Sequence, residues 1–299
     1  MNGSDRTLAT LVGDGAFFEN PRWHDGRLWV SDYWRYQVSA ISPEGATEIV
    51  AGVPGSPSGL GWLPDGTLLV VSMQDNTLLR VEDGATVQHA DLSACSGGQS
   101  NDMVVDATGR AYVSTIDFMA FADMPTTNLV RVDPDGSVSV AADGLSFPNG
   151  LVITPDGSTL IVAESWAQRL TAFDLQPDGS LAKRREWAQF APPPAAGTQG
   201  PPAEWSCAPD GIALDAEGAV WVADAANKRA VRVREGGLIL EEIGAGDLDV
   251  LACALGGDDG RTLFLCATPD YRLMPDEAAT TLPARILTCR VDVPHAGRP

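Results

Sequence analysis

The chain has 299 residues and a formal net charge of −20 at pH 7. A negative charge of this size disfavours nucleic acid and anionic membrane surfaces as partners, because both are polyanions. No stretch approaches the ~20 apolar residues that span a bilayer, and the first residues lack the apolar segment of a signal peptide. The five cysteines are scattered and form no Cys-x-x-Cys pair, which favours free thiols and a cytoplasmic location.

One short pattern recurs six times along the chain: an apolar strand, a tight turn that ends in glycine, and a second apolar strand. The turn glycines are Gly26, Gly66, Gly109, Gly157, Gly218 and Gly260. Further strand-like segments, such as Gln37–Ile41 and Arg169–Phe173, follow each pair. A period of ~40–50 residues with about four strands per unit is typical of a β-propeller. The pattern predicts an all-β fold, a single six-bladed propeller of four-stranded antiparallel blades over residues 1–299.

The N-terminal segment Thr7–Val12 has the character of a spare strand, and the last unit has only three clear strands. We expect this segment to add the outer strand of the sixth blade and so to close the ring of blades. Closure removes an unpaired strand edge that invites aggregation. The alternative is an N-terminus that pairs with nothing.

The blades of a propeller begin with their innermost strand, so the residues before these strands lie on one face, close to the axis. We call this the upper face; the glycine turns lie on the opposite, lower face. Counting back from each turn glycine places six residues at equivalent positions there: Glu19, Ser58, Asn101, Asn149, Asp210 and Ala252. Segments far apart in the sequence are therefore predicted to meet at the axis.

Two carboxylates and two amide oxygens among these residues suit a hard divalent cation. Ca²⁺ is the expected ion, Mg²⁺, Mn²⁺ and Fe²⁺ also fit, and Zn²⁺ fits less well because it prefers nitrogen and sulfur ligands. Turn formation is the alternative explanation for Asn149-Gly150 and Asp210-Gly211, since both are common turn pairs. It does not explain Glu19, because Glu is a poor turn former.

Four segments resemble the regucalcin/gluconolactonase family, also called the senescence-marker-protein family, of six-bladed propellers. They are Glu19–Asp32, Ser100–Gly109, Phe147–Leu151 and Pro209–Asp215. In that family a Glu, two Asn and an Asp bind one divalent cation at the axis. By motif, the resemblance implies the metal ligands Glu19, Asn101, Asn149 and Asp210. Family members include lactonases and luciferin-regenerating proteins, so the resemblance implies a metal-dependent hydrolase of a small-molecule lactone or ester.

The sequence departs from the sugar lactonases of this family in the substrate pocket. Gln99 stands where they carry an Arg, and the loss of a fixed cation argues against a simple sugar lactone. Many aromatic residues fall on the upper-face loops and favour a less polar substrate. They are Phe17, Phe18, Tyr33, Trp34, Phe118, Phe121, Phe147, Trp166, Trp205 and Tyr271. The candidate substrate-binding residues are Gln99, Asn101, Phe118 and Trp205.

Two long loops, Ala191–Ala208 and Thr268–Pro283, fall on the same face and are expected to wall the pocket. Their proline and glycine content also fits a surface linker.

Asp210 is the candidate general base, because a carboxylate beside the cation can take a proton from water. Asp32, Glu164 and Asp224 end the second strands of their blades on the same face, as partners of the site or as solvated strand ends. A Ser-His-Asp hydrolase is disfavoured, since there are three histidines and no Gly-x-Ser-x-Gly motif. A ligand-binding propeller stabilised by metal, and a family member that isomerises or rearranges a ring without adding water, are the alternatives.

Overall fold

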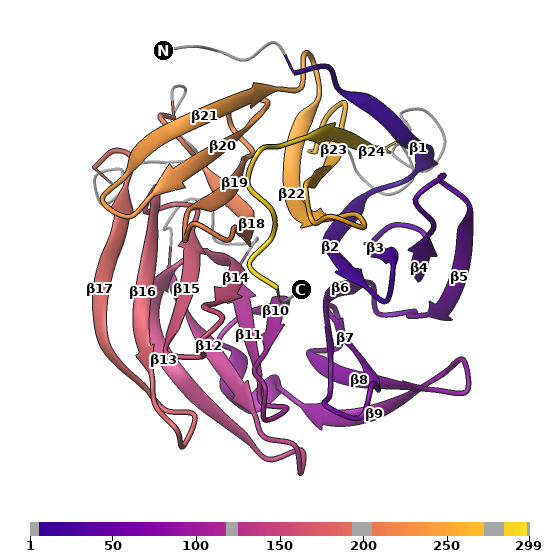
Figure 1. Ribbon diagram of the computed structural model, residues 1–299. Coiled ribbons are helices and arrows are strands. Elements are labelled where there is room, and N and C mark those ends of the chain that lie inside the picture. The colour runs from indigo at the N-terminus through magenta and orange to yellow at the C-terminus, as the bar shows by residue number, and fades with distance from the viewer. Residues whose placement is uncertain (1–5, 118–124, 193–204, 272–283, 298–299) are drawn as a thin grey trace.

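The computed structural model describes residues 6–117, 125–192, 205–271 and 284–297. These residues form six four-stranded antiparallel sheets, arranged as blades around one axis (Figure 1). The six-bladed propeller predicted from the repeat is therefore confirmed. The described part of the chain contains a single helix turn, α1 (Ser93–Ser96), and no helix that could cross a membrane.

Blades one to three follow the order of the chain, and each runs outward from the axis. Blade one contains β2 (Phe18–His24), β3 (Arg27–Asp32), β4 (Gln37–Ile41) and β5 (Thr47–Gly52). Blade two contains β6 (Pro57–Trp62), β7 (Leu68–Ser72), β8 (Thr77–Glu82) and β9 (Ala85–Asp91). Blade three contains β10 (Gln99–Val105), β11 (Ala111–Ile116), β12 (Thr126–Val132) and β13 (Val138–Ser146).

Blades four to six repeat the arrangement. Blade four contains β14 (Pro148–Ile153), β15 (Thr159–Glu164), β16 (Arg169–Leu175) and β17 (Leu181–Gln189). Blade five contains β18 (Pro209–Leu214), β19 (Val220–Asp224), β20 (Arg229–Arg234) and β21 (Leu238–Gly244). Blade six contains β22 (Asp249–Gly256), β23 (Thr262–Thr268), β24 (Ala284–Arg290) and β1 (Ala9–Gly15).

Strand β1 closes the ring of blades, as expected from the sequence. It pairs antiparallel with β24 from Ala9 opposite Thr288 to Gly15 opposite Ala284, and the two strands lie side by side in Figure 1. Val12 of β1 is buried in the apolar core between blades one and six. The first and last parts of the chain thus complete one blade together, which fixes the spacing of all six inner strands.

The inner strands lie close to one another around the axis, and glycines permit this approach. A Cβ atom on Gly59 of β6 would lie 2.6 Å from the Cβ of Met103, and one on Gly150 of β14 would lie 2.6 Å from the backbone oxygen of Asp210. No side chain fits at such distances. The narrow spacing therefore brings residues of different blades into contact at the upper ends of these strands.

Each inner strand also changes register near its upper end. In blades one to five, two residues of the inner strand lie opposite one residue of the second strand, as between Pro148 and Leu151 of β14. Such bulges bend a strand and redirect its side chains. The bulges occur at or next to the predicted metal ligands. They redirect these side chains from the faces of the sheet toward the axis.

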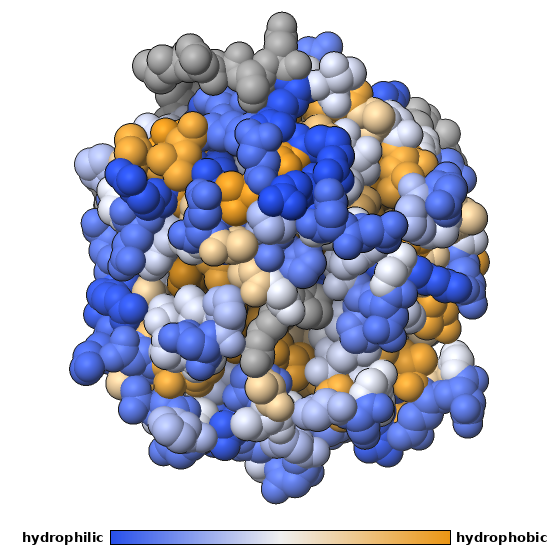
Figure 2. All heavy atoms as spheres, in the orientation of Figure 1, coloured by the Kyte–Doolittle hydropathy of each residue, from blue (hydrophilic) through white to orange (hydrophobic). Residues whose placement is uncertain are grey.

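The chain ends on the lower face, where it joins two blades. Backbone hydrogen bonds link Pro294 to Ala216 (2.8 Å), His295 to Gly260 (2.9 Å) and Ala296 to Leu214 (3.1 Å). In Figure 1 this segment, in yellow, runs from blade six toward the axis. Figure 2, in the same view, shows a mostly hydrophilic face with scattered apolar residues. All five cysteines are free thiols, as the sequence predicted.

Candidate metal centre

The four predicted metal ligands lie near the upper ends of four inner strands, β2, β10, β14 and β18. Asn101 Nδ2 donates a hydrogen bond to Asn149 Oδ1 at 2.7 Å, so the two amides are in direct contact. The charge of Glu19 acts on the carboxyl of Asp210, which places these two groups near one another as well. The structure therefore brings together the oxygen atoms that the sequence singled out.

Two further residues complete what we call the axial ring: Glu19, Ser58, Asn101, Asn149, Asp210 and Leu251. Ser58 Oγ donates to Asn101 Oδ1 at 2.9 Å. The sequence alignment placed Ala252 in the sixth position, and this was wrong. The backbone of Ala252 packs against Gly211, as Gly211 itself packs against Gly150, so Ala252 is equivalent to the residue after the ligand. The inner strand of blade six has one more residue between the ring position and its turn than the inner strand of blade four, which shifts the equivalence to Leu251.

Both carboxyl groups of the axial ring are hard to ionise without a cation. Burial, followed by the charge of Asp102, raises the pKa of Glu19 to about 8. Burial, followed by the charges of Glu19 and Asp102, raises the pKa of Asp210 well above its ordinary value. Leu251, between them in the ring, is an apolar neighbour that offers no hydrogen bond. These are the conditions in which a positive ion stabilises both carboxylates at once.

The donors and acceptors of the axial ring fit a hard cation. Glu19 accepts one long hydrogen bond, from the backbone nitrogen of Asn20 at 3.3 Å. Among the described residues, no three His, Cys, Asp or Glu side chains gather closely enough to hold a metal. An ion here would therefore need the amide oxygens of Asn101 and Asn149 beside the two carboxylates. Such an all-oxygen set suits Ca²⁺, Mg²⁺ or Mn²⁺ better than Zn²⁺.

Three buried carboxylates fasten the chain just before three of the candidate ligands. Asp32 accepts from the backbone nitrogens of Ala16 and Phe17, both at 3.0 Å, ahead of Glu19. Glu164 accepts from Ser146 nitrogen at 2.8 Å, ahead of Asn149. Asp224 accepts from Ala208 nitrogen at 3.0 Å, ahead of Asp210. These residues are neither solvated strand ends nor direct partners of the site: they anchor the loops that deliver its side chains.

Arginine side chains pair with two of these buried carboxylates. Arg169 forms two hydrogen bonds of 2.9 Å with Glu164, and Arg229 forms one of 2.8 Å with Asp224. Burial alone would raise the pKa of Glu164, but the hydrogen bonds from Arg169 and from Ser146 nitrogen bring it below the ordinary value. The surroundings of the anchoring carboxylate in blade four thus favour its ionised form, whereas those of the axial ring oppose ionisation.

A buried ion pair lies beneath the axial ring. Arg22 Nη2 lies 2.9 Å from Asp102 Oδ1 and also donates to the backbone oxygen of Met103 at 2.7 Å. It joins blade one to blade three, past blade two. The sequence analysis missed this pair. The sequence held a signal of an unusual role for Asp102. This residue directly follows the ring position of its blade, where three other blades have a glycine, at positions 59, 150 and 211.

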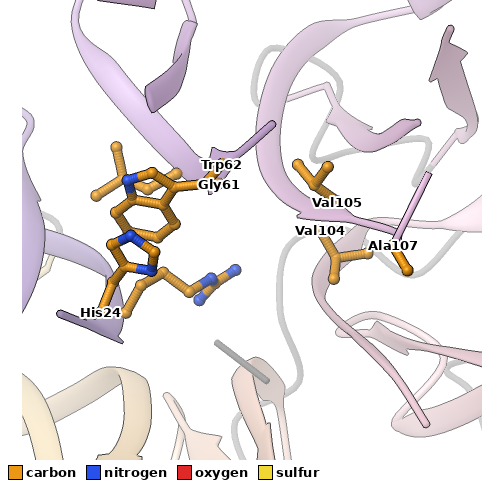
Figure 3. Close-up of a pocket in the computed structure, with 8 residues that line it drawn as sticks. His24, Gly61, Trp62, Val104, Val105 and Ala107 are labelled. Atoms are coloured by element: carbon orange, nitrogen blue, oxygen red, sulfur yellow. The ribbon is translucent and has the colours of Figure 1, made fainter. Parts of the chain in front are cut away.

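The other end of the inner strands holds a separate pocket of about 240 Å³. His24 and Trp62 stack on one side, with ring centroids 4.0 Å apart. Val104, Val105 and Ala107 lie across from them (Figure 3). Arg22 also lines this pocket, so its ion pair with Asp102 lies between the pocket and the axial ring.

Apolar side chains form a collar on the upper face, drawn from blades one to five. Four are buried: Met73, Ile116, Phe147 and Trp166. Tyr33 and Trp205 pack against them and are half-buried. Phe147 and Trp166 stack at 4.6 Å between ring centroids. The four buried members therefore serve mainly to pack the wall of this face. Tyr33 and Trp205 keep exposed surface that a ligand can contact.

The other residues predicted to bind or surround a substrate differ in burial. Gln99 begins β10, is half-buried and pairs with Ile116 at the upper end of the sheet. The indole nitrogen of Trp205 is buried and has no hydrogen-bond partner among the described residues. Phe18 is buried in the apolar core between blades one and six. Phe118 and most of the loops Ala191–Ala208 and Thr268–Pro283 lie outside the described residues.

Curated relatives of this chain are named lactonases. The chain is 29% identical to 6-deoxy-6-sulfogluconolactonase of Pseudomonas putida over 67% of its own length and 64% of that protein, less than two thirds of the relative. It is 27% identical to pentonolactonase XacC of Haloferax volcanii, over 83% of this chain and 80% of that protein.

Solved structures share the fold. A regucalcin from Agrobacterium tumefaciens, described as a calcium-binding protein, matches with a TM-score of 0.79 and 19% identity over 98% of this chain and 97% of that one. A luciferin-regenerating enzyme matches with a TM-score of 0.78 and 17% identity over 97% of both chains. Residues 17–268 match the family described as SMP-30/Gluconolactonase/LRE-like region. The chain belongs to this SMP-30/gluconolactonase/LRE-like family.

Proposed function

We propose that the protein is a divalent-metal-dependent hydrolase that opens a lactone or a related ester. The observation that carries the proposal is the convergence of Glu19, Asn101, Asn149 and Asp210 at one end of the axis, with two carboxyls that resist ionisation in the absence of a cation. The lactonase names of the curated relatives support the same class of reaction.

Glu19, Asn101, Asn149 and Asp210 would hold the ion through their oxygen atoms. When bound, a divalent cation polarises the carbonyl of the substrate and stabilises the negative charge that develops on its oxygen. Ca²⁺ is the proposed ion, because the oxygen-only set suits its coordination. The buried pair of Arg22 and Asp102 supports this ring from below.

Asp210 is the proposed general base. It takes a proton from the attacking water while the water oxygen bonds to the carbonyl carbon. The bond from that carbon to the ring oxygen then breaks, and the proton passes from Asp210 to the departing oxygen. The product is a hydroxy acid that contains one added water. An isomerase of the same fold would give a product of unchanged mass, so mass spectrometry separates the two.

The proposed substrate is less polar than a simple sugar lactone. Tyr33 and Trp205 of the collar offer apolar surface to a substrate. Gln99 stands where the sugar lactonases of the family carry an Arg, so a positive side chain that would bind hydroxyl or carboxylate groups is missing.

The first prediction concerns the metal. Chelation should abolish hydrolysis, and Ca²⁺, Mn²⁺ or Mg²⁺ should restore it better than Zn²⁺. Glu19→Gln should lower kcat/KM by about 100-fold or more, since loss of even an outer partner of a metal site costs 10–100-fold. Asp210→Ala should abolish turnover. The control is Glu217→Gln, an exposed carboxylate on the lower face, which should leave activity unchanged. Turnover that survives both chelation and loss of the two axial carboxylates would contradict the proposal.

The second prediction concerns pH. Because the pKa of Glu19 is about 8 without metal, a cation must displace a proton to bind at neutral pH. The affinity for Ca²⁺ should therefore rise as the pH rises from about 6 to 8, with protons released on binding. In the metal-free protein the folded state binds more protons than the unfolded state in this range, so stability should fall as pH rises. Calorimetric titration in buffers of different ionisation enthalpy measures the release; affinity that is flat with pH would contradict the account.

The third prediction concerns the substrate. Trp205→Ala should raise KM for alkyl- or aryl-substituted lactones by about 5–30-fold, the effect of losing ~1–2 kcal/mol of apolar contact. KM for unsubstituted sugar lactones and the affinity for Ca²⁺ should not change. Trp62→Ala, at the opposite end of the axis, is the matched control. An equal loss for sugar and apolar lactones in Trp205→Ala would show that this residue does not set substrate polarity.

A further inference from the structure

We propose that Ser58 is a positioning residue of the metal centre, whose hydroxyl orients Asn101 and then releases the oxygen of that residue to the cation. The inference rests on the proposed function. Ser58 occupies the axial ring between Glu19 and Asn101 and is 1% exposed. It is the ring's remaining oxygen-bearing side chain, beside the four candidate ligands.

Ser58 contacts two amide side chains. Its Oγ lies 2.9 Å from Asn101 Oδ1 and 3.0 Å from the side-chain amide of Asn20. A hydroxyl has one proton to donate. If the nitrogen of the Asn20 amide faces Ser58, Asn20 donates to the hydroxyl; if the oxygen faces it, Asn20 competes with Asn101 for the proton of Ser58.

The Asn20 amide is oriented by Asp102. An amide oxygen directed at a carboxylate would be repelled, whereas with the amide turned its nitrogen donates to Asp102 and its oxygen accepts from Ser58 Oγ at 3.0 Å. Arg22 holds Asp102 in place from the other side at 2.9 Å. The chain from Arg22 through Asp102 to Asn20 therefore presents an acceptor to Ser58.

Ser58 thus has two acceptors, Asn20 Oδ1 and Asn101 Oδ1, for a single proton. Asn101 cannot turn away to relieve this competition, because its nitrogen is engaged with Asn149 Oδ1 at 2.7 Å. When the hydroxyl donates to Asn101, it fixes the direction of Oδ1 in the absence of metal. When it donates to Asn20, both lone pairs of Asn101 Oδ1 are left for a cation.

The backbone of Ser58 is fixed independently. Ser31 Oγ donates to the backbone oxygen of Ser58 at 2.6 Å, and Ser31 is fully buried on β3. Ser31 lies opposite Glu19 where β3 pairs with β2, but among the described residues its hydroxyl forms no hydrogen bond with a candidate ligand. This difference provides a matched control, since removal of either hydroxyl takes one buried hydrogen bond from the same place in the fold.

The test compares Ser58→Ala, Ser58→Thr and Ser31→Ala in the full-length protein after removal of metal. Calorimetric titration with Ca²⁺ gives the affinity, and thermal unfolding without metal gives the stability. Ser58→Ala should weaken Ca²⁺ binding by about 10-fold or more, the usual effect of losing an outer partner of a metal ligand. Ser58→Thr keeps the hydroxyl and should restore most of the affinity. Ser31→Ala should lower the melting temperature and leave the affinity unchanged.

Luminescence lifetimes of bound Tb³⁺ in H₂O and D₂O count the waters on the ion and separate positioning from direct binding. A positioning role predicts the same number in wild type and Ser58→Ala. One additional water in the variant would show that Ser58 is itself a ligand and would overturn the proposal. The proposal would also be overturned if Ser58→Ala bound Ca²⁺ as tightly as the wild type does. An equal loss of Ca²⁺ affinity in Ser58→Ala and Ser31→Ala would overturn it as well. If the wild-type protein binds no divalent ion, the proposed metal dependence fails, and the role of Ser58 fails with it.

Discussion

The central constraint in this molecule is the crowding of carboxyl groups at one end of a closed ring of strands. Glu19 and Asp210 are partly shielded from water and lie near each other and near Asp102. Burial and mutual repulsion therefore oppose the ionisation of both carboxyl groups. A protein that only needed a stable core would have no use for such a cluster. A cation in the axial ring would remove the conflict, and the anchoring carboxylates and the collar of the upper face surround that place.

Several layers of structure hold these groups in position. Closure by β1 fixes the spacing of the inner strands, and glycines at positions 59, 150 and 211 allow those strands to approach closely. Anchoring carboxylates such as Asp224 hold the loops before the ligands, while the pair of Arg22 and Asp102 supports the ring from below. The collar of apolar side chains lies on the same face, where it can exclude water from a substrate.

The fold and the positions of the candidate ligands were predictable from sequence because both follow from the repeat. Each turn glycine marks the same place in a blade, so counting back from it places Asn101, Asn149 and Asp210 at one end of the axis. The count failed in blade six, where one additional residue of β22 before the turn puts Leu251 in the position assigned to Ala252. The contact of Arg22 with Asp102 was not predictable in this way, because it joins blades one and three and follows no period. The raised pKa of Glu19 likewise depends on distances between blades.

The account is tested most directly by anomalous diffraction from a crystal of the protein soaked in Mn²⁺, recorded near the manganese absorption edge. It predicts one strong peak on the axis, within coordination distance of oxygen atoms of Glu19, Asn101, Asn149 and Asp210. No peak at that place, or a peak bound by other residues alone, would contradict it.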